Sequence, residues 1–323
     1  MTLSLRVIEA RDLNPLIRMF RLVGLNGEAL PGFDAGAHIS VQVKLPNGAS
    51  DWRAYCLVEL DPTADLQAPR SYTIAVRRED QGQGGSRFMH YVMSGEVLNA
   101  KAPKNDFPLH AGNGCVVLIA GGIGVTPMAS MAARCRAQGL PVRMVYAGRS
   151  RESMAFLPQL KELLGDDLVV HADDEAGAPL HVEALLAACG ERDQIHVCGP
   201  KPLLDAVLAT ARARGWPQDR VHFELFAAPV TEASDRGFEV VLAQSQRTVQ
   251  VGAKQSLLDA LIEAGCDPLF DCKRGECGVC TTTVIEGDVE HRDYCQTDAE
   301  RAAGKVIQTC VSRSRGPRLV LDL

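Results

Sequence analysis

Four cysteines near the carboxyl end have the spacing of iron–sulfur ligands. Cys272, Cys277, Cys280 and Cys310 are separated by four, two and twenty-nine residues, a pattern typical of a plant-type 2Fe-2S cluster. Thiolates also suit zinc, but structural zinc sites usually pair two Cys-x2-Cys hooks, and this set contains one. The spacing therefore predicts a 2Fe-2S cluster and a protein that transfers electrons one at a time.

The loop that carries three of these cysteines must bring its backbone close to sulfur. Gly275 and Gly278 permit that approach, with amide groups turned toward the cluster. Cys295 is an alternative fourth ligand. Cys310 lies in an apolar, strand-like segment, 306–311, that can return to the loop, so we predict Cys310 as the fourth ligand.

A second chemical signal lies in the middle of the chain, where an apolar strand runs into three glycines and a helix that begins near Thr126 and Pro127. Glycines let a pyrophosphate reach backbone amides at a helix start. The segment is not G-x-G-x-x-G, and one such turn alone is weak evidence. A second glycine turn follows a later strand, and two turns at the carboxyl ends of parallel strands define a crevice for a dinucleotide. The predicted contact residues are Gly121, Gly122, Gly124, Thr126, Pro127, Cys198, Gly199 and Pro200.

The chain divides into three predicted territories. Short β-rich runs broken by Gly, Pro, Asn and Asp, over 1–110, predict an antiparallel barrel. Alternating strands and helices over 111–228 predict a doubly wound parallel sheet. A linker is predicted at 229–236, and 237–323 contains a hairpin, a helix capped by Ser256, the cysteine loop and closing strands. In the middle territory the predicted strands are 115–120, 142–147, 168–171 and 195–198, with helices from 127 and over 154–164, 182–188 and 203–213.

Composition limits the class of protein. The 323 residues are 46% hydrophobic with a net charge of −6 and no block of Lys or Arg, which argues against nucleic acid as a partner. An odd number of cysteines, eleven, favours a reducing compartment. The amino-terminal segment meets charge too early for a secretion signal. The uncharged stretch 115–133 contains three glycines and Pro127, so we expect no membrane span and a cytoplasmic protein.

Taken together, these features resemble the phthalate dioxygenase reductase family, the flavin and iron–sulfur reductases that serve Rieske-type oxygenases. The resemblance covers essentially the whole chain. It implies a flavin-binding barrel, a nicotinamide domain and a C-terminal plant-type ferredoxin (β-grasp) domain, with FMN, NADH and a 2Fe-2S cluster as cofactors. Its markers are the segments 53–57, 74–76, 84–86, 105–109, 121–127, 198–200, 222–226 and 319–323, together with the cysteine set.

The resemblance also implies roles for barrel residues. Arg53 should bind the flavin phosphate together with Gly84, Gly85 and Ser86, and the segment Ala54 and Tyr55 should pack on the isoalloxazine ring. The polar edge of that ring should meet backbone at Ile74, Ala75 and Val76. Without the family, an arginine beside a tyrosine is commonly a surface pair and Gly84-Gly85 commonly a hairpin turn. Arg70 and Tyr72 mimic the arginine–tyrosine motif, but Arg53 fits better.

Three further residues are expected around the reacting rings. Cys56 stands where the family usually has Ser or Thr, whose hydroxyl is expected to bond the flavin near N5, and a thiol donates more weakly. Thr126 and Cys198 are implied to line the nicotinamide pocket, so these three residues form the predicted catalytic set. Phe226 is implied to border the flavin.

Two charged segments leave alternatives open. Arg149, Ser150 and Arg151 follow the second strand of the predicted sheet, where they could hold an adenine ribose or a 2′-phosphate. Asp173 and Asp174 would repel such a phosphate if they lie nearby, so NADH is preferred over NADPH. Lys273 and Arg274 in the cysteine loop could raise the cluster potential, contact an acidic partner, or form a solvated surface pair.

Electron counting gives the expected reaction. A nicotinamide delivers a hydride, the cluster accepts one electron, and a flavin mediates between them. We expect an NADH:acceptor oxidoreductase, monomeric, that forms a transient complex with a terminal Rieske-type aromatic-ring oxygenase or demethylase. The alternatives are a reductase for a haem-thiolate monooxygenase, the FAD-containing subunit of a dihydroorotate dehydrogenase, and a non-enzymatic interaction module stabilised by zinc.

Overall fold

The computed structural model describes residues 2–226 and 232–323, which form two compact units, Met1–Glu224 and Leu225–Leu323. Part of the predicted linker 229–236 lies outside the described residues. Each unit has its own apolar core.

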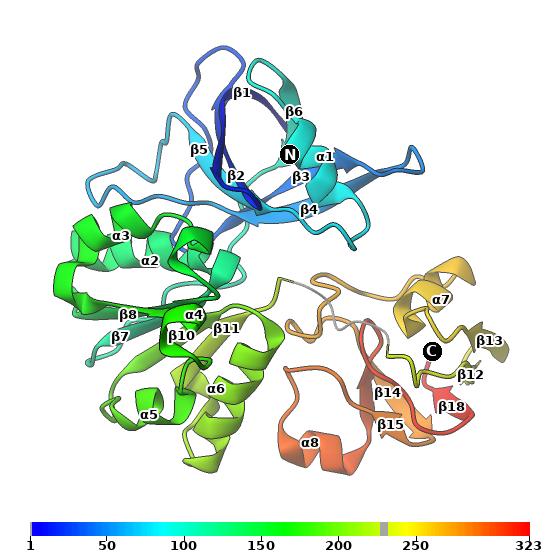
Figure 1. The fold of residues 1–323 in the computed structure, drawn as a ribbon. Helices are drawn as coiled ribbons and strands as arrows, with labels where there is room; N and C mark the ends of the chain where they lie inside the picture. The colour runs from blue at the N-terminus through cyan, green and yellow to red at the C-terminus, as the bar shows by residue number, and fades with distance from the viewer. Residues whose placement is uncertain (1, 227–231) are drawn as a thin grey trace. The chain divides into compact units, whose positions relative to one another are not determined.

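The first unit begins with an antiparallel barrel, as predicted (Figure 1). Its sheet has the order β4-β3-β6-β1-β2-β5, and an isolated bridge between Leu57 and Ile74 brings its two edges together. Buried residues alternate along β3 and β5, which places every second side chain in the barrel core. The strands are β1 (Thr2–Asn14), β2 (Ile17–Gly24), β3 (His38–Lys44), β4 (Ser50–Cys56), β5 (Tyr72–Arg77) and β6 (Val97–Lys101), and helix α1 (Gly85–Tyr91) lies between β5 and β6.

The parallel sheet follows, with the order β11-β10-β7-β8-β9. Helices α2 and α3 lie on one face and α5 and α6 on the other (Figure 1), so the doubly wound fold is confirmed. Its elements are β7 (Val116–Gly121), α2 (Val125–Ala137), β8 (Val142–Gly148), α3 (Leu157–Leu164), β9 (Leu168–Ala172), α4 (Asp173–Ala176), α5 (Val182–Ala187), β10 (Gln194–Cys198), α6 (Lys201–Ala213) and β11 (Val221–Glu224), with short 3-10 turns at Gly122–Gly124, Arg151–Ser153, Gly165–Asp167 and Gln218–Arg220.

Three elements of this region differ from expectation, and one of them, helix α4, is not among the predicted helices. The helix predicted over 154–164 begins at Leu157, because Phe156 has a left-handed φ of 60° that a helix cannot include. Strand β11 is not among the predicted strands. It completes the sheet beside β10, with Cys198 paired in register with Glu224.

The barrel and the parallel sheet share one apolar core, which explains why they form a single unit. Ile17, Met19 and Ala75 of the barrel belong to the same buried cluster as Met128 and Met131 of α2. Ser130 of α2 also donates to the carbonyl of Leu57 at 2.7 Å and accepts from the N–H of Glu59 at 2.8 Å. The predicted division near residue 110 therefore runs between two folds that are packed together, and it stays a prediction.

The second unit is built on a mixed sheet of order β13-β12-β18-β14-β16, in which β12 and β18 run parallel. Ser256 caps α7 as predicted, since its hydroxyl accepts from the N–H of Asp259 at 3.0 Å. Helix α8 is not predicted, although Thr297 and Glu300 form a capping box that is readable in the sequence. The elements are β12 (Phe238–Leu242), β13 (Arg247–Val251), α7 (Leu257–Glu263), β14 (Thr281–Glu286), β15 (Val289–Glu290), α8 (Asp298–Ala303), β16 (Val306–Gln308), β17 (Arg313–Ser314) and β18 (Arg318–Leu321).

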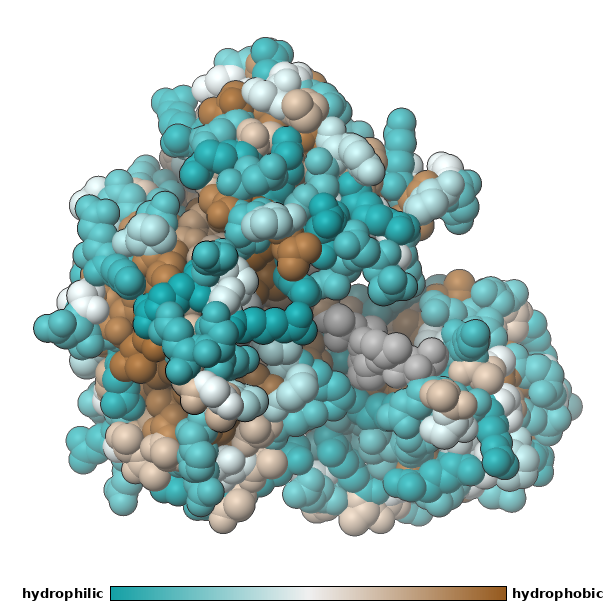
Figure 2. Space-filling view, in the orientation of Figure 1, coloured by the Kyte–Doolittle hydropathy of each residue, from teal (hydrophilic) through white to brown (hydrophobic). Residues whose placement is uncertain are grey.

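The surface agrees with the polar composition. Hydrophilic residues make up most of the face shown in Figure 2. Within the described part of the chain, no helix is both long and apolar enough to cross a membrane. The uncharged stretch 115–133 forms β7, a glycine turn and most of α2.

Three histidines stack inside the first unit. The rings of His110 and His222 are parallel with centroids 4.0 Å apart, and the centroids of His196 and His222 are 4.8 Å apart. His196 is fully buried, and its Nε2 accepts from the backbone N–H of His110 at 3.0 Å. Burial, followed by the neighbouring histidines, lowers the pKa of His196 to about 3, and burial lowers that of His222 to about 4.

We expect this stack to make the first unit less stable in acid. The unfolded chain takes up protons below the ordinary histidine pKa of 6.5, while the folded unit does not until pH 3 to 4. Stability is therefore lost as pH falls below about 6.5, and His196 alone should cost about 2 kcal/mol at pH 5 relative to pH 7. Urea unfolding at both pH values can be followed by tryptophan fluorescence, because both tryptophans, Trp52 and Trp216, lie in this unit.

The His196→Phe variant is the control for this prediction. Its own stability at pH 7 is not the test, since the substitution also removes an acceptor from the His110 N–H. The difference between pH 7 and pH 5 should shrink by about 2 kcal/mol. A variant that loses as much stability in acid as the unaltered protein would show that other groups carry the effect.

Candidate functional site

The cysteine loop adopts the backbone that its glycines were predicted to allow. Gly275 and Gly278 have φ of 79° and 71°, where residues other than glycine are strained. A Cβ atom on Gly275 would lie 2.7 Å from Cγ2 of Val311. The loop therefore packs closely against the segment that contains Cys310.

Within that loop the predicted ligands converge. Cys280 Sγ lies 3.2 Å from Cys310 Sγ, and the N–H of Arg274 donates to Cys272 Sγ at 3.3 Å. The N–H and the hydroxyl of Thr309 both donate to the carbonyl of Cys280, at 3.3 and 3.2 Å. Hydrogen bonding from the Cys310 thiol is the main cause that lowers the pKa of Cys272 to about 4 and that of Cys280 to about 6. Thiols that share protons in this way are suited to be thiolate ligands.

Cys295 has a different environment. Its Sγ donates to the carboxylate of Asp293 at 3.7 Å. Burial, with the carboxylate of Asp293 adding to it, raises the pKa of Cys295 to about 12. Geometry therefore favours Cys310 over Cys295 as the fourth ligand, because Cys310 Sγ lies 3.2 Å from Cys280 Sγ while Cys295 Sγ donates to Asp293.

The two glycine turns of the parallel sheet meet at the carboxyl ends of neighbouring strands, as predicted. A Cβ atom on Gly124 would lie 2.2 Å from the carbonyl oxygen of Cys198, and one on Gly121 would lie 2.6 Å from Cδ of Pro200. Gly122 has a φ of 53° with open space around it, where a ligand could approach. Gly199 packs on Gly121, since its Cβ would lie 3.0 Å from Gly121 Cα.

The start of α2 differs slightly from expectation. The helix begins at Val125, after a 3-10 turn, so Thr126 and Pro127 lie inside its first turn. Thr126 is buried, and its hydroxyl donates to the carbonyl of Ile123 at 3.0 Å rather than capping the helix. Cys198, at the end of β10, is also fully buried.

On the barrel, Arg53 and the segment 84–86, which we call the phosphate clamp, lie close together. Arg53 on β4 donates to the side chain of Gln83 at 2.8 Å and forms an ion pair with Asp51. A Cβ atom on Gly85 would lie 3.0 Å from Cγ of Arg53, so the arginine lies against the start of α1. Gly84, with a φ of 102°, precedes that helix, and the hydroxyl of Ser86 accepts from the N–H of Glu79 at 3.0 Å.

The rival arginine–tyrosine pair lies elsewhere. Arg70 donates to the carbonyl of Gly27 at 3.2 Å. Tyr72 is fully buried in the barrel core, and its hydroxyl donates to the carbonyl of Pro31. This arrangement favours Arg53 as the clamp.

Strands β4 and β5 carry the residues that are predicted to contact the flavin ring. Ile74 and Val76 point into the barrel core, while Ala75 belongs to the core shared with α2. The carbonyl of Val76 bonds to Nε2 of His90 at 3.0 Å. Tyr55, which follows Ala54 on β4, is largely buried, and burial raises the pKa of its hydroxyl.

Sequence reasoning missed one residue at this site, Glu224. Cys56 Sγ donates to Oε2 of Glu224 at 3.3 Å, and only 6% and 4% of the two residues are exposed. Glu224 ends β11 beside Cys198, the partner of its strand register. Glu224 therefore contacts one predicted catalytic cysteine, Cys56, and is the strand neighbour of another, Cys198. The marker segment 222–226 includes Glu224. Its contact with Cys56 could not be predicted, because the two residues lie on distant strands, β4 and β11, and no local pattern links them.

The basic segment 149–151, which follows β8, lies beside acidic residues. Arg151 forms an ion pair with Glu175 at 2.6 Å. The N–H of Asp174 donates to the carbonyl of Arg149 at 3.1 Å, so the acidic residues do lie next to this segment. Ser150 takes part in a capping box with Ser153.

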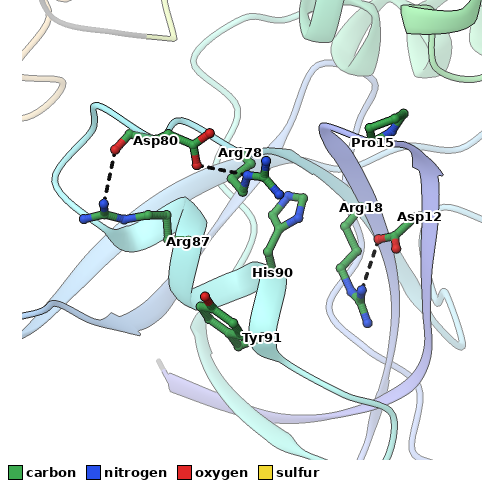
Figure 3. A pocket seen from close by; sticks show the side chains of 8 residues that line it. All are labelled: Asp12, Pro15, Arg18, Arg78, Asp80, Arg87, His90 and Tyr91. Carbon is green, nitrogen blue, oxygen red and sulfur yellow. Dashed lines mark hydrogen bonds and ion pairs between the residues drawn. The ribbon is translucent and has the colours of Figure 1, made fainter.

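A pocket in the first unit includes Arg87, the residue directly after Ser86 (Figure 3). Asp12 pairs with Arg18 and Asp80 with Arg78, both at 3.0 Å, so two of its guanidinium groups are already neutralised. We assign this pocket no part in electron transfer. It is lined by Asp12, Pro15, Arg18, Arg78, Asp80, Arg87, His90 and Tyr91.

Comparison with known proteins identifies both nucleotide and cluster domains. Residues 118–208 match the oxidoreductase NAD-binding domain, and residues 240–315 match the 2Fe-2S iron-sulfur cluster binding domain. Across residues 2–226 and 232–323, no three His, Cys, Asp or Glu side chains are arranged to hold a single metal ion. Four cysteines of a 2Fe-2S cluster are shared between two irons. The match to the 2Fe-2S domain favours this cluster over the zinc alternative.

Relatives cover the whole chain. A phthalate dioxygenase reductase of Burkholderia cepacia is 34% identical over 99% of this chain and 97% of its own length. A crystal structure of phthalate dioxygenase reductase, described as a modular structure for electron transfer from pyridine nucleotides to 2Fe-2S, matches all of this chain and 98% of its own, with a TM-score of 0.72 and 34% identity.

The chain belongs to the phthalate dioxygenase reductase family. As a member of this family it is an oxidoreductase that uses NADH, FMN and a 2Fe-2S cluster. Two other relatives show the range of systems. A putative toluene-4-sulfonate monooxygenase system reductase subunit of Comamonas testosteroni is 40% identical over 92% of both chains. The beta subunit of a heme-dependent oxidative N-demethylase of Ectopseudomonas mendocina is 38% identical over 99% of both chains.

Proposed function

We propose that this reductase, as a monomer in the cytoplasm, forms a transient complex with a terminal Rieske-type aromatic-ring oxygenase or demethylase and supplies it with single electrons. The observation that carries this proposal is the full-length match to reductases of phthalate and toluene-4-sulfonate oxygenase systems.

The residues present fit the groups that the family binds. When bound, FMN accepts a hydride from NADH, and the cluster accepts and releases single electrons. Arg53 and the start of α1 offer a guanidinium and backbone amides to the FMN phosphate. Gly121, Gly122 and Gly124 offer a close backbone approach to the NADH pyrophosphate. We propose Cys272, Cys277, Cys280 and Cys310 as the cluster ligands.

We place the buried pair of Cys56 and Glu224 beside the reacting rings. Together with Thr126 and Cys198, it would exclude water and orient the nicotinamide against the flavin. Phe226, 38% exposed and assigned to the second unit, keeps its proposed place at the flavin border. Ala54, Tyr55, Ile74, Ala75 and Val76 keep their proposed contacts with the ring.

The Cys56→Ser variant should bind FMN normally and be reduced by NADH about two- to tenfold faster. A hydroxyl donates more strongly than a thiol, and a hydrogen-bond difference of about 1 kcal/mol corresponds to roughly fivefold in rate. Anaerobic rapid mixing with NADH measures the step directly as flavin bleaching. Identical rates in both proteins would remove Cys56 from the hydride-transfer site.

The preference for NADH has a structural basis in Glu175. Its carboxylate neutralises Arg151 at 2.6 Å, and Asp174 lies beside the same segment. A 2′-phosphate here would meet two carboxylates and a guanidinium that is already paired, whereas a ribose could use Arg149 and Ser150. This arrangement supports NADH as the donor.

A haem enzyme is the second candidate partner. The relative in a heme-dependent oxidative N-demethylase spans the whole chain at 38% identity, a value close to the 40% of the toluene-4-sulfonate reductase subunit. Internal electron transfer would be the same, and only the acceptor would differ.

Reconstitution decides between these acceptors. The purified reductase is mixed with candidate Rieske-type oxygenases and with haem monooxygenases, each with its substrate, and product is measured against NADH consumed. We expect tightly coupled turnover with a Rieske-type enzyme. Coupled turnover with haem enzymes only would overturn the proposal, and size-exclusion chromatography with light scattering tests the monomer.

A further inference from the structure

A largely buried carboxylate, that of Glu276, lies in the cysteine loop. It occupies the position directly before Cys277, one of the four proposed ligands. Only 15% of its side chain is exposed, although glutamate is normally a surface residue. Burying an ionised carboxylate is costly unless hydrogen bonds and charge compensate it, so its partners indicate its purpose.

Glu276 has two partners in the second unit. One carboxylate oxygen, Oε2, pairs with Nε of Arg274 at 3.2 Å, and that side chain is also 15% exposed. The other oxygen, Oε1, accepts a hydrogen bond from the backbone N–H of Leu225. Leu225 is itself 5% exposed. The carboxylate thus bridges the cysteine loop and the first residue of the second unit.

The position of Leu225 in the chain gives this hydrogen bond its meaning. Leu225 directly follows Glu224, the last residue of β11, whose carboxylate accepts from the thiol of Cys56. The Leu225 N–H therefore belongs to the peptide bond by which the chain passes from the first unit to the second. Within the proposed function, this peptide bond links the unit that binds the flavin to the unit that carries the cluster.

We propose that Glu276 is a positioning residue for electron transfer from the flavin to the cluster, acting by fixing the cysteine loop to the chain directly after β11. This inference rests on the proposed function. The ion pair with Arg274 orients the carboxylate of Glu276. The hydrogen bond from the Leu225 N–H is the contact that fixes the loop. Loss of that contact would let the loop move, and rates that depend on geometry fall steeply with displacement of an ångström.

Two conservative variants of Glu276 distinguish the effect of its hydrogen bond to Leu225 from the effect of its charge. Glu276→Gln keeps the length and an amide oxygen that can accept from the Leu225 N–H, but it loses the charge. Glu276→Asp keeps the charge but is one methylene shorter. Asp267→Ala, an exposed acidic residue just before the same loop, serves as the matched control.

The experiment is anaerobic rapid mixing of each full-length holoprotein with NADH. Flavin bleaching reports hydride transfer, and the electron paramagnetic resonance signal of the reduced cluster reports the second step, with each rate referred to the iron-loaded fraction. We expect Glu276→Asp to slow cluster reduction about tenfold. Glu276→Gln and Asp267→Ala should stay within about twofold of the unaltered protein. Hydride transfer and the cluster midpoint potential should be unchanged in Glu276→Asp.

The reverse order of effects, with Glu276→Gln slow and Glu276→Asp normal, would show that the charge acts and would overturn the positioning role. Normal cluster reduction in both variants would do the same. If the unaltered protein itself fails to reduce its cluster with NADH, the proposed function fails instead, so the two failures are distinguishable.

Discussion

Replacing Cys310 by serine is expected to abolish electron output through the cluster while leaving flavin chemistry intact. Cys310 Sγ lies 3.2 Å from Cys280 Sγ, and its segment is tied to the loop through Thr309. A serine hydroxyl is a poor ligand for the soft iron–sulfur core. NADH-dependent reduction of cytochrome c should therefore fall by more than about 100-fold. Reduction of ferricyanide, which can take electrons from the flavin, should stay within about twofold of normal.

Cys295→Ser is the matched control, since the two cysteines were rivals for the same role. Cys295 Sγ donates to the carboxylate of Asp293, whereas Cys310 Sγ lies beside Cys280 Sγ, so the Cys295→Ser variant should keep its iron content and its cytochrome c activity. Iron and acid-labile sulfide analysis of both variants completes the measurement. A Cys295→Ser protein without iron, beside an iron-loaded Cys310→Ser protein, would reverse the assignment of the fourth ligand.

Sequence patterns predicted the chemistry of the cysteine loop because three of the four ligands and both glycines lie in one short segment. Three of the ligands lie in one loop and the fourth, Cys310, lies in the turn after β16. Gly275 and Gly278 have the positive φ angles that the loop needs. The choice between Cys295 and Cys310 was harder. It depends on which distant strand returns to the loop, and only the pairing of β14 with β16 brings Cys310 there.

Contacts between elements were beyond the reach of those patterns. Glu224 and Cys56 are 168 residues apart, and Glu276 and Leu225 are 51 residues apart. No periodicity or motif links such pairs, because each depends on how finished strands and loops meet. Strand β11 was also missed, because the polar residues His222 and Glu224 make up half of its four residues and hide the apolar signal of a buried strand.

The glycine turn after β7 gives a further strong prediction: Gly124→Ala should destabilise the first unit by about 3 kcal/mol. Gly124 has an ordinary helical φ of −61°, so the cost is steric rather than conformational. The added methyl would lie 2.2 Å from the carbonyl oxygen and 2.4 Å from the carbonyl carbon of Cys198. These are backbone atoms of a central strand, which cannot move without disturbing the sheet. Urea unfolding followed by the fluorescence of Trp52 and Trp216 measures the loss.

Two other glycines separate packing, strain and cofactor binding. Gly122 and Gly139 have φ of 53° and 64°, and a methyl group at either would meet no atom within 4 Å. Alanine at each should cost about 1 kcal/mol of backbone strain. Only Gly122 lies in the turn proposed for the pyrophosphate, so Gly122→Ala should also raise the KM for NADH about tenfold while Gly139→Ala leaves it unchanged. An equal KM for NADH in Gly122→Ala and Gly139→Ala would show that the dinucleotide does not bind at this turn. A Gly124→Ala protein of normal stability would show that the two glycine turns do not pack as closely as described.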